Sequence, residues 1–193
     1  GMYRSRLPLT TVALTLALAA CTSRSGRDGL LPPGWRYSAP PPPVSGEHAM
    51  VVSEHTLASE VGAEIMRRGG NAIDAAVAVG FAQAVVNPRA GNIGGGGFLV
   101  YRQANGEVFS LDYRETAPAA ASRNMYLDAA GNLTESSVIG ALASGVPGSV
   151  AGMWEMHRRF GRLPWPDVVA PAIALARAHV VDNARHNTLR GNE

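Results

Sequence analysis

Two residue types that carry much of the chemistry of other proteins are scarce or missing in this sequence. The 193-residue chain has one cysteine and no lysine, so all 17 of its basic residues are arginine. One cysteine excludes an internal disulfide and a thiolate zinc cluster. Arg4 and Arg6 precede Cys21, and from that residue on 15 arginines face 15 acidic residues. This balance predicts no basic binding face, so we do not expect nucleic acid as a partner.

The remaining composition predicts an ordered protein. Hydrophobic residues make up 46% of the chain and charged residues 17%, and 22 residues are glycine. These proportions exclude disorder throughout and are sufficient for a sizeable core. The length favours a single domain.

The first 21 residues have the pattern of a bacterial lipoprotein signal peptide. Arg4 and Arg6 form a short positive region, and residues 7–20 form an apolar run that is shorter than the about 20 residues a membrane span needs. The run ends at Leu18-Ala19-Ala20-Cys21, which resembles the box in which the cysteine carries lipid. We predict lipidation of Cys21. The alternative is an ordinary cleavage site with an incidental cysteine.

Residues 22–46 are predicted to be a tether. The segment contains Pro32, Pro33 and the proline run 40–43, with no apolar periodicity, and such a composition favours an extended polyproline II path. The folded domain is then residues 47–193. A lipidated cysteine before a stiff tether predicts an exported protein, periplasmic or at the cell surface, that meets the membrane by its lipid anchor only.

Apolar periodicity along residues 47–193 predicts four helices, a hairpin and one further strand. The expected ranges are a strand at 48–53, helices at 56–68, 72–86, 148–160 and 166–180, and hairpin strands at 98–103 and 107–114. Thr56 is the expected cap of the first helix and Gly69-Gly70 its stop, while Asn71 with Asp74 approaches a capping box. These elements predict a layered α/β or α+β domain.

Several residue types that can perform catalysis have simpler interpretations here. In the helix at 72–86 the only polar side chains are Asp74 and Gln83, which predicts a helix buried on all sides with Asp74 as a cap. The helix at 148–160 is expected to turn four side chains inward, namely Val150, Met153, Trp154 and Phe160. His157 is expected to be a hydrogen-bonded core histidine, because the histidines show no spacing typical of metal ligands. We expect no metal and no cofactor.

The glycine run at residues 91–97 suggests a phosphate-binding loop at first sight. No Gly-Lys-Ser/Thr follows, and the next element is a predicted strand rather than a helix. A tight turn where two backbones approach closely is the favoured interpretation. Ser149 has no base nearby in the sequence, so a serine hydrolase triad is unsupported.

Arg114 ends the second predicted strand on its polar face, beside the glycine run. An arginine there can bind a carboxylate with two parallel hydrogen bonds. The alternative from spacing alone is a surface ion pair with Asp112 or Glu115.

Several motifs occur in order along residues 49–177. They are GNAIDAAVA at 70–78, NP at 87–88, GNIGGGGF at 91–98, LDYRETAP at 111–118, ASGVPGSVAG at 143–152, and PA at 171–172 followed by LAR at 175–177. Together they resemble the start of a γ-glutamyltransferase, a family also called γ-glutamyltranspeptidase or glutathione hydrolase. The pattern fades after Arg177, and we interpret the chain as a truncated or frameshifted product or as a fragment.

This resemblance implies an α+β fold with four αββα layers, of the N-terminal-nucleophile hydrolase type and incomplete in this chain. It implies a precursor that cuts itself into a large and a small subunit and exposes a threonine that attacks γ-glutamyl amides such as glutathione. In the family the arginine of the Arg-Glu-x-Ala-Pro motif, here Arg114, holds the α-carboxylate of the glutamyl group. No residue of this chain matches the nucleophile, so we predict no catalytic residue and no activity for the chain alone.

A second hypothesis belongs to a different class of protein. It describes a lipid-anchored lipoprotein without catalytic activity, which serves as a scaffold or binds γ-glutamyl or glutamate-like ligands. Within the family, a glutaryl-type acylase or a poly-γ-glutamate depolymerase would share these motifs, so the resemblance leaves the substrate open.

Overall fold

The computed structural model of the protein describes residues 42–181 and residue 190. The chain divides into two units, residues 1–45 and 46–193, and each helix and strand of the described part lies in the second. The predicted signal peptide, the lipidation of Cys21 and most of the tether lie outside the described residues. Among the described helices, none is long and apolar enough to cross a membrane.

Helix α2 (Thr56–Arg67) is amphipathic, as its periodicity predicts. Ala58, Gly62 and Ile65 are buried. The cap differs from the prediction, because the Nδ1 atom of His55, and not Thr56, accepts the backbone N–H of Leu57 at 3.1 Å. The helix ends at the predicted glycines: Gly69 has a positive φ of 91°, a conformation that glycine adopts without steric cost.

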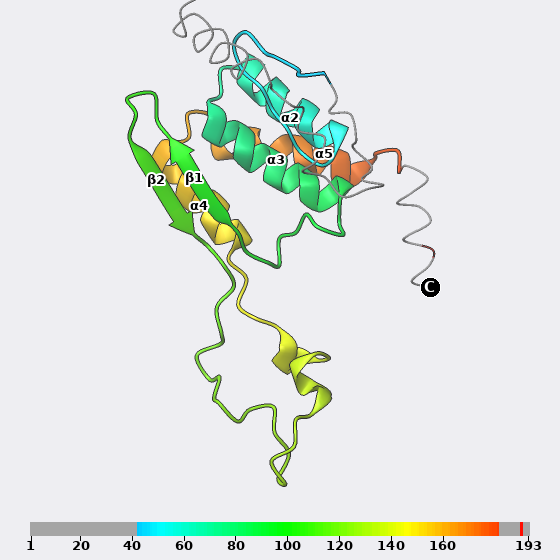
Figure 1. Ribbon diagram of the computed structural model, residues 1–193. Helices are drawn as coiled ribbons and strands as arrows, with labels where there is room; N and C mark the ends of the chain where they lie inside the picture. The colour runs from blue at the N-terminus through cyan, green and yellow to red at the C-terminus, as the bar shows by residue number, and fades with distance from the viewer. Residues whose placement is uncertain (1–41, 182–189, 191–193) are drawn as a thin grey trace, which may run out of the picture. The chain divides into compact units, whose positions relative to one another are not determined.

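Helix α3 (Ala72–Val86) begins with the capping box that its sequence predicts. The side chain of Asn71 accepts the backbone N–H groups of Ile73 and Asp74, while the Asp74 carboxylate accepts the N–H of Asn71. The helix packs against α2, α4 and α5, so it lies at the centre of the helical part in Figure 1. The sequence predicts a helix buried on all sides, and the structure differs from this at Ala72 and Ala76, the two exposed positions along the helix.

The predicted hairpin is present. Strands β1 (Phe98–Arg102) and β2 (Val108–Asp112) pair antiparallel, with Phe98 opposite Asp112 and Arg102 opposite Val108. On the inner face, Tyr101 and Phe109 contact the ring of Phe160 at centroid distances of 5.1 and 5.0 Å. The outer face exposes three apolar side chains, namely Phe98, Val100 and Val108.

Helices α4 (Ser149–Phe160) and α5 (Trp165–Arg177) follow the hairpin. Met153 is buried and Phe160 packs on the core, but Val150 is 44% and Trp154 47% exposed, so these two inward predictions are wrong. The reason is that α4 presents Gly152 to the ring of Tyr113: a Cβ on Gly152 would lie 2.2 Å from Cγ of Tyr113. The close contact turns Val150 and Trp154 to the outside. Helix α5 ends three residues before the predicted position.

The segment at 48–53 is not a strand, contrary to the prediction. It has no hydrogen-bonded partner strand among the described residues, although Val51 packs beside Gly62 of α2. Residues 115–148 form an arm that leaves the hairpin and returns to α4 (Figure 1). The arm carries two short 3-10 helices, η2 (Glu135–Ser137) and η3 (Ala141–Ala143).

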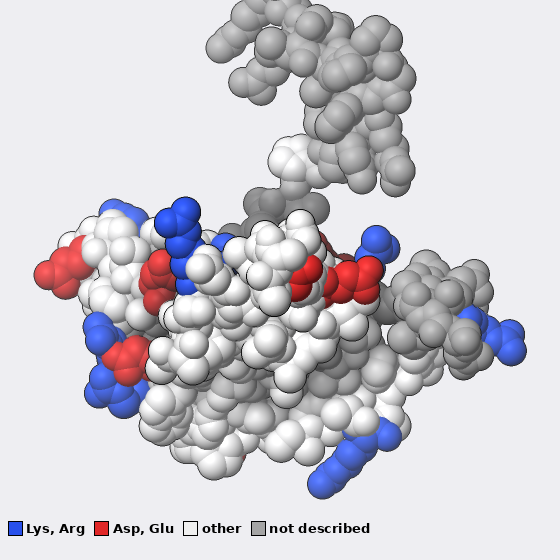
Figure 2. Space-filling model, turned by 90° about the horizontal axis from the view of Figure 1, so that it is seen from below, with Lys and Arg blue, Asp and Glu red and all other residues white. Residues whose placement is uncertain are grey.

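The structure confirms a mixed α and β fold. Its main core cluster draws on α2, α3, α4 and α5 and on the inner face of the hairpin, and Figure 1 shows β1 and β2 lying against α4. On the face seen in Figure 2, arginines are interspersed with acidic side chains. This arrangement accords with the even charge balance of the sequence.

Candidate functional site

Three segments that are far apart in the sequence meet at one end of the hairpin. Gly95 of the glycine run accepts the backbone N–H groups of Gly148 and Ser149, at 2.8 and 2.9 Å, through its carbonyl oxygen. The N–H of Tyr113, just after β2, donates to the carbonyl of Gly97 at 3.0 Å. The glycine run, the residues after β2 and the first turn of α4 therefore form one hydrogen-bonded unit.

Glycine is required where these backbones touch. A Cβ on Gly96 would lie 2.6 Å from Cα of Arg114, and a Cβ on Gly148 would lie 2.0 Å from the carbonyl oxygen of Tyr113. The prediction of a close backbone approach is confirmed. The element after the glycine run is strand β1, whereas a phosphate-binding loop leads into a helix.

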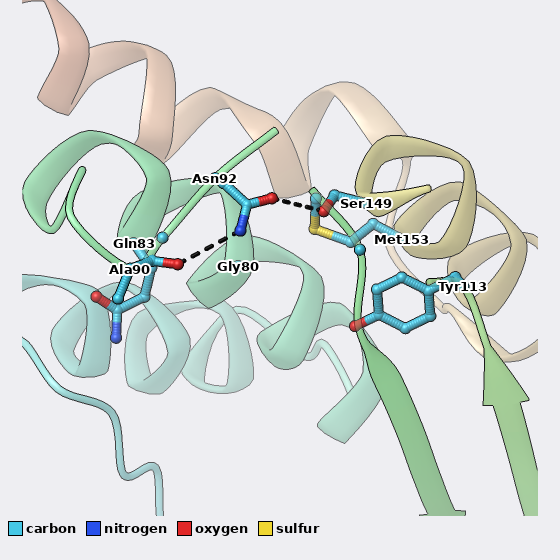
Figure 3. A pocket seen from close by; sticks show the side chains of 9 residues that line it. Gly80, Gln83, Ala90, Asn92, Tyr113, Ser149 and Met153 are labelled. Carbon is cyan, nitrogen blue, oxygen red and sulfur yellow. Dashed lines mark hydrogen bonds between the residues drawn. The ribbon is translucent and has the colours of Figure 1, made fainter. Parts of the chain in front are cut away.

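A polar pair that the sequence patterns did not predict lies at the centre of this unit. The Oδ1 atom of Asn92 accepts the hydroxyl of Ser149 at 2.8 Å and the backbone N–H of Gly95 at 2.7 Å. Figure 3 shows the Asn92 and Ser149 side chains pointing toward each other. Ser149 is only 4% exposed. The sequence offered one signal for this pair: Asn92 and Ser149 both lie in family motifs, at 91–98 and 143–152.

Arg114 lies at the surface of the site. Its Nε donates to Oε2 of Glu115 at 3.0 Å, and its guanidinium lies 5.8 Å from the centroid of Phe98. Its backbone N–H donates to Oδ1 of Asp112 at 2.9 Å. The ion pair considered from spacing is therefore present with Glu115. Among the described residues, Glu115 engages only the Nε, so the Nη groups of this 61% exposed side chain can meet a carboxylate. The carboxylate clamp itself stays a prediction.

Hydrogen bonds within the same unit lower the pKa of the Glu115 carboxyl. Its own backbone N–H lowers the pKa of its carboxyl below the usual value, and the hydrogen bond from Arg114 and the N–H of Gly96 lower it further. The carboxylate is therefore ionised at neutral pH and keeps Arg114 beside the glycine run. Burial acts in the opposite sense on Tyr113, where it raises the pKa of the phenol.

A small cavity lies beside the Asn92–Ser149 pair. It measures about 160 Å³, and its wall includes Gly80, Gln83, Tyr113 and Met153 (Figure 3). Pockets that bind drug-sized ligands measure about 300–1,000 Å³. A substrate as large as a tripeptide therefore needs further walls beyond those that the described residues supply.

The two buried titratable residues singled out from sequence lie in a separate cluster. Asp74 is completely buried and accepts the backbone N–H groups of Asn71, Arg162 and Leu163. His157 Nε2 lies 2.9 Å from the carbonyl oxygen of Leu163 and 3.5 Å from Asp74 Oδ1. The structure confirms both as core residues with hydrogen-bond partners. Across the described residues, no three histidine, cysteine, aspartate or glutamate side chains gather as metal ligands would.

Comparison with known proteins identifies relatives of this arrangement. The sequence model of the gamma-glutamyltranspeptidase family matches residues 58–192. The chain is 52% identical over 128 residues to the glutathione hydrolase proenzyme of Pseudomonas aeruginosa, covering 66% of this chain and 23% of that protein. It is 47% identical over 150 residues to the glutathione hydrolase proenzyme of Escherichia coli K12, covering 77% and 26%.

Solved structures agree with these relatives. The gamma-glutamyltranspeptidase of Helicobacter pylori aligns with a TM-score of 0.73 and 48% identity, over 78% of this chain and 44% of that one. The enzyme from Pseudomonas nitroreducens, solved with L-DON, aligns with a TM-score of 0.70 and 43% identity, over 77% and 44%. The chain spans about a quarter of the length of the curated relatives described above. By the family match, the identities and the shared fold, this chain belongs to the gamma-glutamyltranspeptidase family.

Proposed function

We propose that this chain is the N-terminal part of the large subunit of a γ-glutamyltransferase that also acts as a glutathione hydrolase. The whole enzyme would cleave the γ-glutamyl amide bond of glutathione-like substrates and pass the glutamyl group to water or to an amino-acid acceptor. The observation that carries the proposal is the convergence of three family motifs beside Arg114. Relatives named as glutathione hydrolases support it, and no feature of the described residues favours the non-catalytic lipoprotein.

Arg114 is the residue of this chain that would bind substrate. Its free Nη groups can form charge-assisted hydrogen bonds to the α-carboxylate of the glutamyl group, which sets the position of the γ-amide. In the proposed mechanism a threonine at the start of the small subunit attacks that amide carbon, and its own amine takes up the hydroxyl proton. The amine then passes that proton to the nitrogen of the leaving group as the C–N bond breaks and an acyl-enzyme forms, and water or an acceptor amine attacks the acyl-enzyme to release the threonine. No residue of this chain matches that threonine, so the chain alone would be inactive.

The finer details of the fold are also proposed. In the whole enzyme the hairpin would contribute to one sheet of a four-layer αββα arrangement of the N-terminal-nucleophile hydrolase type. The outer hairpin face supports this, because Phe98, Val100 and Val108 are 64%, 76% and 66% exposed, and apolar side chains grouped in this way favour burial. The small subunit of the same precursor is the proposed partner.

Export and lipid anchoring complete the proposal. The signal-like residues 1–21 and the single cysteine at position 21 support a precursor that is exported and held on a membrane by lipid at Cys21. The proline-rich residues 22–46 would then separate the catalytic domain from the membrane surface. The protein would be periplasmic or at the cell surface.

Glutamate binding by the 193-residue chain tests the proposed role of Arg114. We expect calorimetry to show binding that Arg114→Ala weakens about tenfold or more, since a hydrogen bond to a charged group contributes about 1.5–3 kcal/mol. Arg102→Ala is the matched control, because Arg102 is an exposed arginine at the opposite end of the same hairpin. Equal affinities for the wild type and Arg114→Ala would contradict the clamp. Hydrolysis of a γ-glutamyl anilide by the purified chain would contradict its inactivity.

A further inference from the structure

The Asn92–Ser149 hydrogen bond connects the glycine run to the start of α4. The hydrogen bonds of Arg114 within the described residues go to Asp112 and Glu115 instead. The two side chains are 57 residues apart in the chain. Ser149 is only 4% exposed, whereas Asn92 lies at the surface, and a buried hydroxyl such as that of Ser149 costs free energy unless its hydrogen bond is made. The location of the pair next to the predicted substrate-binding arginine suggests a role beyond packing.

We infer that Asn92, with Ser149, is a positioning residue that holds the backbone of Arg114 where its guanidinium can bind the α-carboxylate of a γ-glutamyl substrate. The inference rests on the proposed function, because it assigns Arg114 the role proposed above. Asn92 itself touches no substrate in this scheme and acts through Gly95 and Gly96.

The Asn92 side chain links the glycine run to the start of α4. One oxygen, Oδ1, accepts two donors: the hydroxyl of Ser149 at 2.8 Å and the N–H of Gly95 at 2.7 Å. The carbonyl of Gly95 in turn accepts two N–H groups from the first turn of α4. Gly95 is therefore held from both its amide and its carbonyl side.

Gly95 is connected to Arg114 through its neighbour Gly96. The next residue, Gly96, is in direct backbone contact with Arg114 and Glu115, since a Cβ there would lie 2.6 Å from Cα of Arg114 and 2.7 Å from the nitrogen of Glu115. The N–H of Gly96 also interacts with the Glu115 carboxylate, and that carboxylate holds the Nε of Arg114 at 3.0 Å. A shift of Gly95 is thus passed to both the backbone and the guanidinium of Arg114.

Position 92 requires a hydrogen-bond acceptor that reaches both Ser149 and Gly95. A Cβ on Gly95 would lie 2.5 Å from Oδ1 of Asn92, so the amide oxygen lies directly against Gly95. An aspartate at this position keeps an oxygen that can accept both hydrogen bonds and has nearly the same volume as asparagine. An alanine has no acceptor atom in its side chain. Asn92→Asp therefore tests whether an oxygen acceptor is sufficient without the amide NH₂ group, and Asn92→Ala removes the acceptor together with the side-chain volume.

Residue-resolved hydrogen exchange on the 193-residue chain measures the positioning directly. We expect Asn92→Ala to increase exchange of the Gly95, Gly96 and Arg114 amides about tenfold, and Asn92→Asp to restore protection to within about threefold of the wild type. Asn105→Ala is the matched control: Asn105 Oδ1 also accepts a backbone N–H, that of Glu107, in the turn at the opposite end of the hairpin. The control should leave these three amides unchanged.

Ligand selectivity separates positioning from a general loss of folded protein. We expect Asn92→Ala and Ser149→Ala to weaken glutamate binding about tenfold and to leave binding of 4-aminobutyrate, which lacks the α-carboxylate, within about twofold. Partial unfolding would weaken the binding of both ligands by the same factor.

Every outcome decides the inference. Increased exchange at Gly95 with no change at Gly96 and Arg114 would overturn the inference. Equal losses of affinity for glutamate and 4-aminobutyrate would also overturn it. So would an Asn92→Asp variant whose amides exchange as fast as those of Asn92→Ala. If the wild-type chain binds no glutamate, the proposed function loses its support in this chain, and the exchange at Arg114 alone decides the positioning role. If Arg114→Ala abolishes binding while Asn92→Ala does not, the function stands and the positioning role falls.

Discussion

The carboxylate of Asp74 accepts the backbone N–H of Arg162 at 3.0 Å, although 88 residues separate the two in the chain. The same carboxylate caps α3 through the N–H of Asn71. One buried side chain therefore ties the start of α3 to the connection between α4 and α5. Asn92, which follows α3, and Ser149, at the start of α4, make a second polar link between distant segments.

Replacing Asp74 tests the first of these links. We expect Asp74→Asn to lower the free energy of unfolding by about 3 kcal/mol, because an NH₂ group would then face backbone N–H donors in a buried site. Asp167→Asn is the control: Asp167 lies in the first turn of α5, where losing a charge near the helix dipole costs about 0.3–1 kcal/mol. Urea denaturation of the chain measures both. Similar small losses for the two variants would contradict the role given to Asp74.

The glycine run and the start of α4 predict a contrast between two glycines. Gly148→Ala would place a Cβ 2.0 Å from the carbonyl oxygen of Tyr113, whereas Gly94→Ala would meet no atom within 4 Å. We expect the first to cost about 1–3 kcal/mol of stability through overpacking and the second to change stability by less than about 0.5 kcal/mol. Thermal unfolding of both variants is the measurement, and a well-tolerated Gly148→Ala would show that the backbones are further apart.

The ion pair between Arg114 and Glu115 predicts a pH response. Since the pKa of Glu115 is lowered from 4.5 by its own backbone N–H, Arg114 and Gly96, Arg114→Ala should raise that pKa toward 4.5. The lowered pKa also means that the pair's contribution to stability is present above the unfolded-state pKa and is lost as the pH falls through the lower, folded-state pKa.

Carboxyl chemical shifts followed by NMR between pH 2 and 7 check the titration of Glu115. The reference is Asp128 in the arm, whose carboxyl pKa is lowered by hydrogen bonds from Asn132 and should be the same in Arg114→Ala. An unaltered Glu115 titration in Arg114→Ala would show that the pair does not form in solution.

The two faces of the hairpin should respond differently to substitution. Val100→Thr changes a side chain that is 76% exposed on the outer face, so we expect a stability change within about 0.5 kcal/mol. Leu111→Ala removes a side chain that packs on the core cluster, and we expect a loss of about 2 kcal/mol. Denaturation midpoints compare the two. A large loss of stability from Val100→Thr would mean that the outer face of the hairpin is covered in solution.

The sequence predicted the helix ends and the turn that depend on residues close to one another in the chain. The capping box at Asn71 and Asp74, the glycine stop of α2 and the hairpin turn at Asn105-Gly106 follow from hydrogen bonds and backbone conformations within a few residues. The strand end and the glycine run drew attention to Arg114, and the family motifs predicted an α+β fold and the role of Arg114 in binding a carboxylate.

Other features depend on contacts between distant segments, which periodicity does not encode. The inward face of α4 was mispredicted because Gly152 packs on Tyr113, 39 residues earlier in the chain. The strand expected at 48–53 needs a partner strand that the described residues do not supply.

The sequence by itself therefore determined the helices, the hairpin and the family, because their signals lie in adjacent residues. Only the tertiary structure decided that Asn92 bonds to Ser149 and that Gly96 touches Arg114. Both contacts require segments that are close in space but far apart in the chain. Their physical basis is the packing of α4 against α3 and the hairpin, and this packing is a property of the folded chain as a whole.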